Sequence, residues 1–367
     1  MQRRIVVKVG SSSLTTASGE LDNSKVQYYA AELARLRGEG YTVLLVTSGS
    51  VAAGFGMIGY GQRPKLLHEK QAAAAVGQAL LMQAYAEAFS KHHCKVAQVL
   101  LTRSDFSDRR RAHNAMMTVE ELLRRGILPI INENDTVAID ELKFGDNDTL
   151  SALVANLVKA SQLIILTDTD GLYSEDPRKN PEAKRIDRVT AIDDQIMRIA
   201  GEAGTAVGTG GMRSKVEAAK IAVRGGIPVF VGTAKEEGDV LKAVLNEGKG
   251  TYFESHERKL PMKKQWVGFH SLPNGRIIVD QGASEALISA GKSLLPVGVL
   301  EVEGDFVPGD VVEVVAEDGI LIGKGIVNYS AEQLRASAGL ATTEAVRKVG
   351  VQRAEVIHRD EWMSLYP

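Results

Sequence analysis

The chain has 367 residues, of which 44% are hydrophobic, and its 44 basic and 46 acidic residues give a net charge of −2. A chain of this length exceeds what one hydrophobic core usually serves, so we expect two domains. The balanced charge gives no general attraction to nucleic acids or anionic membranes. The function must therefore be argued from particular sites.

Cysteine content and hydropathy narrow the cellular setting. Cys94 is the only cysteine, which excludes an intrachain disulfide and is compatible with a reducing compartment. The sequence has no apolar run of about 18 residues, and the apolar segment after Arg4 is interrupted at Lys8, too early for a secretory signal. We expect a cytoplasmic protein without a membrane segment.

Short apolar runs alternate with amphipathic stretches over the first two thirds of the chain. The runs predict strands at 5–9, 43–47, 96–101, 128–132, 163–167 and 228–231, and the stretches predict helices at 24–37, 68–91, 112–125, 149–159, 191–200 and 213–224. Such alternation is typical of the α/β class, with a mainly parallel sheet sandwiched by helices. In such folds, ligands bind at the carboxyl ends of the strands.

Polar residues and glycines follow several of the predicted strands. They occur at 8–11 (KVGS), 47–50 (TSGS), 132–135 (NEND), 145–148 (GDND) and 167–168 (TD). Any one such cluster can be explained as an Asx turn or a helix cap. Because the clusters recur at one end of the predicted sheet, we expect a binding site there.

Two lysines in glycine-rich surroundings suggest that the ligand is a phosphate. Gly210 and Gly211 precede a predicted helix whose first turn carries Lys215, and a helix N-terminus with a nearby lysine suits an anion. Lys8 lies in a strand that ends at Gly10. Each feature has a plainer explanation, a tight turn for the glycines and an exposed lysine at a sheet edge for Lys8. The common phosphate-binding pattern G-x-x-x-x-G-K-[ST] is absent, so a different nucleotide-binding architecture is required.

Taken together, these segments resemble the amino acid kinase family. The similarity extends over essentially the whole chain and is carried by 8–11, 47–49, 132–135, 145–148, 166–168, 171–173 and 208–215. Within the family, the segments are similar to the members that use ATP to convert L-glutamate into L-glutamyl 5-phosphate, the first step of proline biosynthesis. One position departs from the pattern, because Ser214 stands where threonine is usual; either hydroxyl can face a phosphate.

The resemblance implies roles for particular residues. Lys8 and Lys215 would reach the transferring phosphoryl group, and Asp148 would lie between them and orient both; these three are the catalytic candidates. A plainer role for Asp148 is the N-cap of the helix that follows it. The implied ATP-binding residues are Lys8, Gly10, Thr167, Asp168, Thr209, Gly210, Gly211, Met212, Arg213, Ser214 and Lys215. Mg²⁺ is implied by the nucleotide and would be held by phosphate oxygens and water, without a metal site formed by the protein.

The same matching implies that Ser48, Asp135 and Asn147 bind L-glutamate. An ionised Asp135 can pair with the substrate ammonium, while Ser48 and Asn147 offer hydrogen bonds to its carboxylates. An N-acetylated substrate would leave a buried Asp135 unpaired, so this assignment disfavours acetylglutamate. The alternative is that Asp135 is only a turn residue.

The composition changes near residue 255. We expect a catalytic domain at 1–255, a charged linker at 256–272, a small mostly-β domain at 273–353 and a C-terminal tail at 354–367, with strands at 276–280, 299–302, 310–315 and 320–327. Segments 293–298, 304–306 with 309–310, and 323–325 resemble PUA domains, some of which bind RNA. Residues 273–353 contain 7 basic and 11 acidic side chains, a net charge of −4 that argues against RNA binding.

Partners and regulation follow from the resemblance alone. It implies a homo-oligomer, dimer or tetramer, inhibition by proline, and transfer of the unstable acyl phosphate to glutamyl phosphate reductase. Two alternatives stay open: another amino acid kinase acting on acetylglutamate, aspartate or carbamate, and an RNA-associated regulator built on a kinase scaffold.

Overall fold

The computed structural model describes residues 3–137, 147–177, 179–180, 182–202, 211–255, 267, 271, 273–351 and 353–364. The chain forms two compact units, the larger made of residues 1–105 and 109–259 and the smaller of residues 106–108 and 260–367. The predicted linker at 256–272 lies outside the described residues except for Val267 and Ser271.

The larger unit is built on one eight-stranded sheet with the order β3-β4-β2-β1-β5-β7-β8-β6. All of its pairings are parallel except that of β7 with β8, which confirms the expected mainly parallel sheet. The strands are β1 (Arg4–Val9), β2 (Thr42–Thr47), β3 (Val96–Leu101), β4 (Leu128–Glu133), β5 (Gln162–Leu166), β6 (Arg188–Val189), β7 (Val229–Gly232) and β8 (Gly250–Phe253). The sequence did not predict β6 or β8.

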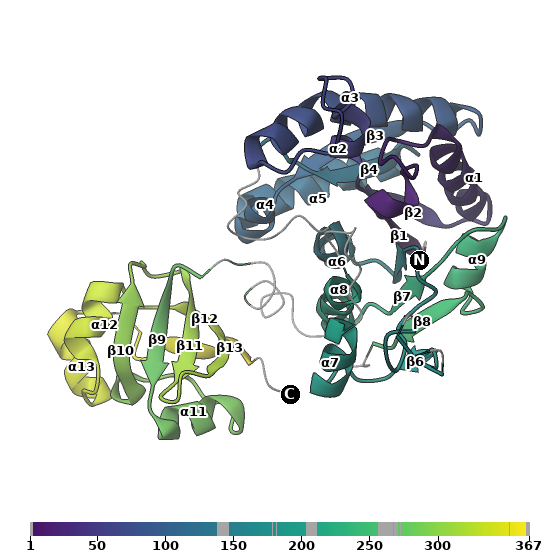
Figure 1. The fold of residues 1–367 in the computed structure, drawn as a ribbon. Helices are drawn as coiled ribbons and strands as arrows, with labels where there is room; N and C mark the ends of the chain where they lie inside the picture. Colours follow the sequence, from purple (N-terminus) through teal and green to yellow (C-terminus); the bar gives the residue numbers. More distant parts are fainter. Residues whose placement is uncertain are drawn as a thin grey trace. The chain divides into compact units, whose positions relative to one another are not determined.

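Helices cover both faces of this sheet (Figure 1). They are α1 (Asn23–Gly38), α2 (Ser50–Gly54), α3 (Leu67–Ser90), α4 (Arg103–Ser107), α5 (Arg109–Arg124), α6 (Asn147–Leu157), α7 (Asp194–Glu202), α8 (Met212–Arg224) and α9 (Asp239–Val244). The six predicted helices are present, whereas the short helices α2, α4 and α9 were not predicted.

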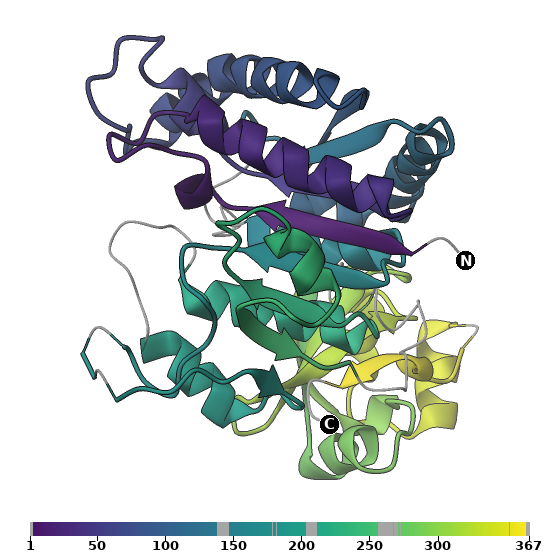
Figure 2. The same ribbon diagram turned by 90° about the vertical axis from the view of Figure 1, so that its right-hand side faces the viewer.

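Alternation along β1 decides which side chains face which helices. Ile5, Val7 and Val9 belong to a buried cluster that includes apolar residues of α1, α3 and α9. Figure 2 shows α1, in purple, lying over the purple strand β1. Because successive side chains of a strand point to opposite faces, Val6 and Lys8 face the other side of the sheet, which α6 and α8 cover. The strand pattern thus turns a buried lysine toward these two helices.

Two glycines allow α2 to pack tightly against α3. A Cβ on Gly54 would lie 2.0 Å from the carbonyl oxygen of Ala73, and one on Gly77 would lie 1.8 Å from that of Ser50. Neither position accepts a side chain without moving backbone. The contact holds α2 in place immediately after the Ser48-Gly49 turn, where Gly49 has a φ of 111° that favours glycine.

The smaller unit contains a five-stranded sheet with the order β10-β9-β11-β12-β13. Its strands are β9 (Gly275–Val279), β10 (Val299–Gly304), β11 (Val311–Ala316), β12 (Leu321–Val327) and β13 (Ile357–Ser364), and its helices are α11 (Gln281–Ile288), α12 (Ala331–Ser337) and α13 (Thr342–Val349). Strand β13 pairs with β12, so the expected tail at 354–367 is, over Ile357–Ser364, part of the sheet. Its apolar residues Ile357 and Trp362 belong to the buried core of this unit.

Candidate active site

A cavity of about 620 Å³ opens at the carboxyl ends of the central strands of the larger sheet. Its described lining is polar and comes from the ends of β1, β2, β4 and β5, the starts of α6 and α8, and the 11–19 and 48–63 segments. The lining residues are Lys8, Gly10, Ser11, Ser12, Thr15, Thr16, Ala17, Ser18, Gly19, Lys25, Ser48, Gly49, Ser50, Val51, Arg63, Asn132, Glu133, Asp135, Asn147, Leu166, Thr167 and Lys215.

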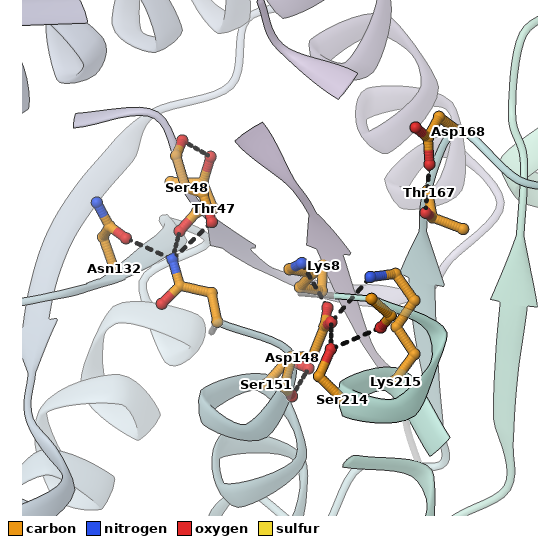
Figure 3. A network of polar contacts seen from close by, with 12 residues as sticks. Lys8, Thr47, Ser48, Asn132, Asp148, Ser151, Thr167, Asp168, Ser214 and Lys215 are labelled. Atoms are coloured by element: carbon orange, nitrogen blue, oxygen red, sulfur yellow. Dashed lines mark hydrogen bonds and ion pairs between the residues drawn. The ribbon is translucent and has the colours of Figure 1, made fainter. Parts of the chain in front are cut away.

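Two lysines and a carboxylate form the base of the cavity. Lys8 Nζ pairs with Asp148 Oδ1, and Lys215 Nζ lies 3.1 Å from Asp148 Oδ2. Figure 3 shows both ammonium groups directed at this one carboxylate. Asp148 is 0% exposed, Lys8 4% and Lys215 6%. Buried charges are stable only when they are paired, so Asp148 holds two cations together that would otherwise repel each other.

Each member of this cluster is placed by a local feature of its element. Lys8 lies on the face of β1 turned toward α6 and α8, as its position between Val7 and Val9 requires. Asp148 lies in the first turn of α6, which begins at Asn147, so it does not precede the helix as an N-cap would. Lys215 lies in the first turn of α8, whose N-cap Gly211 makes no side-chain capping hydrogen bond. Both helices therefore direct their N-terminal ends toward the cluster.

Ser214 and Gly10 complete the surroundings of this cluster. The Ser214 hydroxyl lies 3.0 Å from Asp148 Oδ2 and 2.8 Å from the carbonyl oxygen of Gly211, so it contacts both the carboxylate and the start of α8. A Cβ on Gly10 would lie 3.2 Å from Lys8 Nζ. Gly10 therefore leaves space at the lysine ammonium group for a ligand atom.

A second polar group occupies the wall formed by β2, β4 and the start of α6. Asn147 Nδ2 lies 2.5 Å from the carbonyl oxygen of Thr47, 2.8 Å from Ser48 Oγ and 2.8 Å from Asn132 Oδ1, so its two hydrogens are shared among three acceptors. Asn147 Oδ1 is buried and accepts no hydrogen bond from the described residues. We expected Asn147 to donate to a substrate carboxylate, but its N–H groups are already used within the protein. The Ser48 hydroxyl, which accepts from Asn147, keeps its own proton for a ligand.

Asp135 lies at the edge of this wall, where Ser50 Oγ donates to its Oδ2 at 2.6 Å. Burial raises the pKa of the Asp135 carboxyl above its ordinary value of 3.8, while the Ser50 hydrogen bond and the positive charge of Arg63 act to lower the pKa. A partly desolvated carboxylate of this kind gains from a cationic ligand, because the ligand charge replaces lost hydration.

The remaining residues expected to bind ATP differ in their position relative to the cavity. Thr167 lines the cavity and its hydroxyl lies 3.0 Å from Asp168 Oδ1, but Asp168 is exposed and is not among the described lining residues. Met212 is buried at the start of α8, and Arg213 points along that helix to Glu217 at 3.1 Å. Thr209 and Gly210 lie outside the described residues.

Sequence reasoning missed two groups near the cavity. Gln78 on α3 accepts from Asn132 Nδ2 at 2.8 Å, although nothing in the pattern of α3 distinguishes it from a solvent-facing polar residue. Arg63 lines the cavity from the segment between α2 and α3. Its only sequence signal is a positive charge in a loop.

The described residues include no group of three or more histidine, cysteine, aspartate or glutamate side chains arranged to hold a metal ion. Among the same residues, no helix is both long and apolar enough to cross a membrane.

Comparison with protein-family models gives two matches. A model described as the amino acid kinase family matches residues 3–233, and a model described as the PUA domain matches residues 275–349. The second match falls on the unit that carries the five-stranded sheet.

Individual relatives match along the whole chain. Glutamate 5-kinases from Bacillus cereus and Geobacillus kaustophilus are each 49% identical to it over 365 residues, which is 99% of this chain and 100% and 98% of theirs. Among solved structures, the carbamate kinase from Giardia lamblia bound to AMP-PNP has a TM-score of 0.51 at 16% identity and covers 70% of this chain and 99% of its own. At that identity, the structural likeness shows a shared fold and nothing more.

Proposed function

Because the chain belongs to the amino acid kinase family, we propose that it transfers the γ-phosphoryl group of ATP to the γ-carboxylate of L-glutamate, giving L-glutamyl 5-phosphate. Full-length relatives named glutamate 5-kinase support this substrate. The observation that carries the proposal is the convergence of Lys8 and Lys215 on Asp148 beside a polar cavity.

The chemistry fits a site without a catalytic base. A free γ-carboxylate has a pKa of about 4.3, so the nucleophile is already ionised at neutral pH. The site must bring two anions together and neutralise the charge that moves onto the leaving phosphate oxygens, which is a matter of positioning and electrostatics. Ammonium groups and backbone N–H groups do this without proton transfer.

In this proposal Lys8 and Lys215 bind the transferring phosphoryl group from two sides. Asp148 acts as a positioning residue, since its two carboxylate oxygens hold the two ammonium groups within one small volume. The first turn of α8 and Thr167 contribute to binding the nucleotide phosphates. The ATP residues expected at Asp168 and 209–214 remain part of the proposal.

Mg²⁺, typical of ATP-dependent kinases, would enter with the nucleotide, because the described side chains form no acidic cluster that would hold the ion alone. When bound, it would supply positive charge to the phosphate oxygens. The protein residues around it would then orient the phosphates.

Glutamate would be recognised by both its charges. Asp135 pairs with the α-ammonium group, and the Ser48 hydroxyl donates to a carboxylate. The buried Asn147 Oδ1 is an acceptor, so it suits the ammonium group better than a carboxylate. An N-acetylated substrate would place a neutral amide against Asp135 and leave that carboxylate unpaired.

The test is ADP release, coupled to a standard detection system, with L-glutamate, N-acetyl-L-glutamate and L-aspartate, each with and without proline. We expect turnover with L-glutamate and inhibition by proline, which shares the α-amino acid head group. Preferred turnover of another panel member would replace the proposed substrate. No turnover with any of them would contradict the proposal.

The smaller unit suggests a second candidate function, because some PUA domains bind RNA. Its net charge of −4 over residues 273–353 opposes that function, so we propose a structural or regulatory role instead. A salt-sensitive RNA mobility shift would reverse this choice. We also propose that the chain forms a homo-oligomer and passes its acyl phosphate directly to glutamyl phosphate reductase.

A further inference from the structure

We infer that Gln78, in the middle of α3, is a positioning residue that supports the amino acid pocket from behind, because it supplies the acceptor for Asn132 and so holds Asn132, Asn147 and Ser48 in place. The inference rests on the proposed function, because it concerns the residues that would bind the amino acid. It adds to the site a residue that does not itself line the cavity.

Gln78 belongs to a chain of four side-chain amides that runs from the sheet edge to the cavity. Gln98 Oε1 on β3 accepts from Gln78 Nε2 at 2.9 Å, and Gln78 Oε1 accepts from Asn132 Nδ2 at 2.8 Å. Asn132 Oδ1 accepts from Asn147 Nδ2 at 2.8 Å. In each link, the amide nearer the cavity donates to the amide farther out.

Two backbone groups fix this direction. The N–H of Glu133 donates to Asn132 Oδ1 at 2.9 Å, so the oxygen of that amide must point to the N–H and its nitrogen must point to Gln78. The carbonyl oxygen of Thr47 accepts from Asn147 Nδ2 at 2.5 Å, so the nitrogen of Asn147 must point there. A backbone N–H can only donate and a backbone carbonyl can only accept, so reversing either amide would bring two like groups together.

The fixed direction decides what the pocket offers to a ligand. Asn147 donates to Ser48 Oγ at 2.8 Å, so the Ser48 hydroxyl directs its own proton elsewhere and becomes a donor for an anionic oxygen. Among the described contacts, Gln78 Oε1 is the acceptor for Asn132 Nδ2. Asn132 is 1% exposed, so water does not readily replace this acceptor.

The test compares Gln78→Met, which has a similar length but only a weak sulfur acceptor, with Gln78→Glu, which keeps a strong acceptor for Asn132 and loses the donor to Gln98. We expect Gln78→Met to raise the KM of the amino acid substrate about tenfold, the worth of one buried hydrogen bond, while the KM of ATP stays within about twofold. Gln78→Glu should keep the wild-type KM for the amino acid substrate. Gln98→Ala, at the exposed outer end of the chain, is the matched control and should leave all constants unchanged.

A double-mutant cycle with Ser48→Ala separates positioning from general weakening of the fold. If Gln78 acts through Ser48, the effect of Gln78→Met on the amino acid KM should largely disappear when Ser48 is already alanine. Equal increases in both backgrounds, or equal increases for ATP and the amino acid, would overturn the inference. If Gln78→Met does not fold, a rise of more than about fivefold in the amino acid KM of folded Gln78→Glu would overturn it.

The constants are measured with whichever amino acid the wild-type protein phosphorylates. Absence of turnover with L-glutamate in the wild type would therefore count against the proposed substrate. Unchanged amino acid KM in Gln78→Met would count against the role of Gln78, whichever amino acid is used.

Discussion

Replacing Asp148 with asparagine removes the charge that holds two buried lysines together. The carboxylate is 0% exposed and contacts Lys8, Lys215 and Ser214. Breaking a buried ion pair from one side costs about 3–5 kcal/mol, because the remaining charge stays desolvated. For a unit of this size, that loss lowers Tm by roughly 10 °C. Loss of one preorganised donor lowers kcat about 10²–10³-fold, and this change disorients two.

The assay measures kcat by coupled ADP release and Tm by differential scanning calorimetry on the same samples. Ser214→Ala is the matched control, because it removes one hydrogen bond to the same carboxylate oxygen and leaves both ion pairs in place. The loss of this hydrogen bond should lower the free energy of unfolding by about 1 kcal/mol. Wild-type kcat in Asp148→Asn, or a loss no greater than that of Ser214→Ala, would refute the positioning role of Asp148.

Three further predictions concern the pocket wall. Asp135→Asn should raise the KM of L-glutamate at least about tenfold through loss of a charged hydrogen bond. The Tm of the ligand-free variant at neutral pH should be equal to or higher than that of the wild type. Burial raises the pKa of the Asp135 carboxyl, so its ionised form is unfavourable in the folded state and asparagine removes that cost. A lower Tm would contradict this reading. Affinity for glutamate should fall as the pH drops toward the raised pKa of Asp135, since protonation removes the charge that pairs with the ammonium group. Because the positive charge of Arg63 lowers this pKa, Arg63→Gln should shift the acidic limb of the pH profile of kcat/KM to higher pH. Lys65→Gln, in the same loop, should leave that limb unchanged. Finally, Gly77→Ala should lower Tm and raise the KM of glutamate, because its Cβ would lie 1.8 Å from a carbonyl oxygen at the start of α2, while Gly61→Ala, with open space around its Cβ, should change neither. Equal Tm values for the two glycine variants would show that α2 does not depend on this contact.

The main features of the larger unit could be predicted because periodicity and strand-end residues carry most of its structure. The apolar run at 5–9 placed Lys8 in a strand that ends at Gly10, and the helices predicted at 149–159 and 213–224 placed Asp148 just before one helix and Lys215 in the first turn of the other. The elements that were missed lack a pattern of sufficient length. Strand β6 has two residues, and β13 carries a run of polar residues between Ile357 and Trp362 that reads as a tail.

The types of residue in the site could be predicted from the sequence, but the directions of their hydrogen-bond donors and acceptors could not. The sequence placed Asn147 near the ligand, yet the direction of its amide depends on a backbone carbonyl of β2, which is far away along the chain. Gln78 gave no signal, because a polar residue on a long helix is usually exposed to solvent. Donor and acceptor directions depend on tertiary contacts, and these become visible only in the folded structure.

The most direct test of the central claim is a crystal structure of the protein with L-glutamate and a non-hydrolysable ATP analogue. We expect Lys8 Nζ and Lys215 Nζ both to lie within hydrogen-bonding distance of the γ-phosphoryl oxygens while Asp148 still bridges them, with the glutamate ammonium group at Asp135. A γ-phosphoryl group bound elsewhere in the cavity, with either lysine turned away from it, would show that the two lysines do not bind the transferred group together.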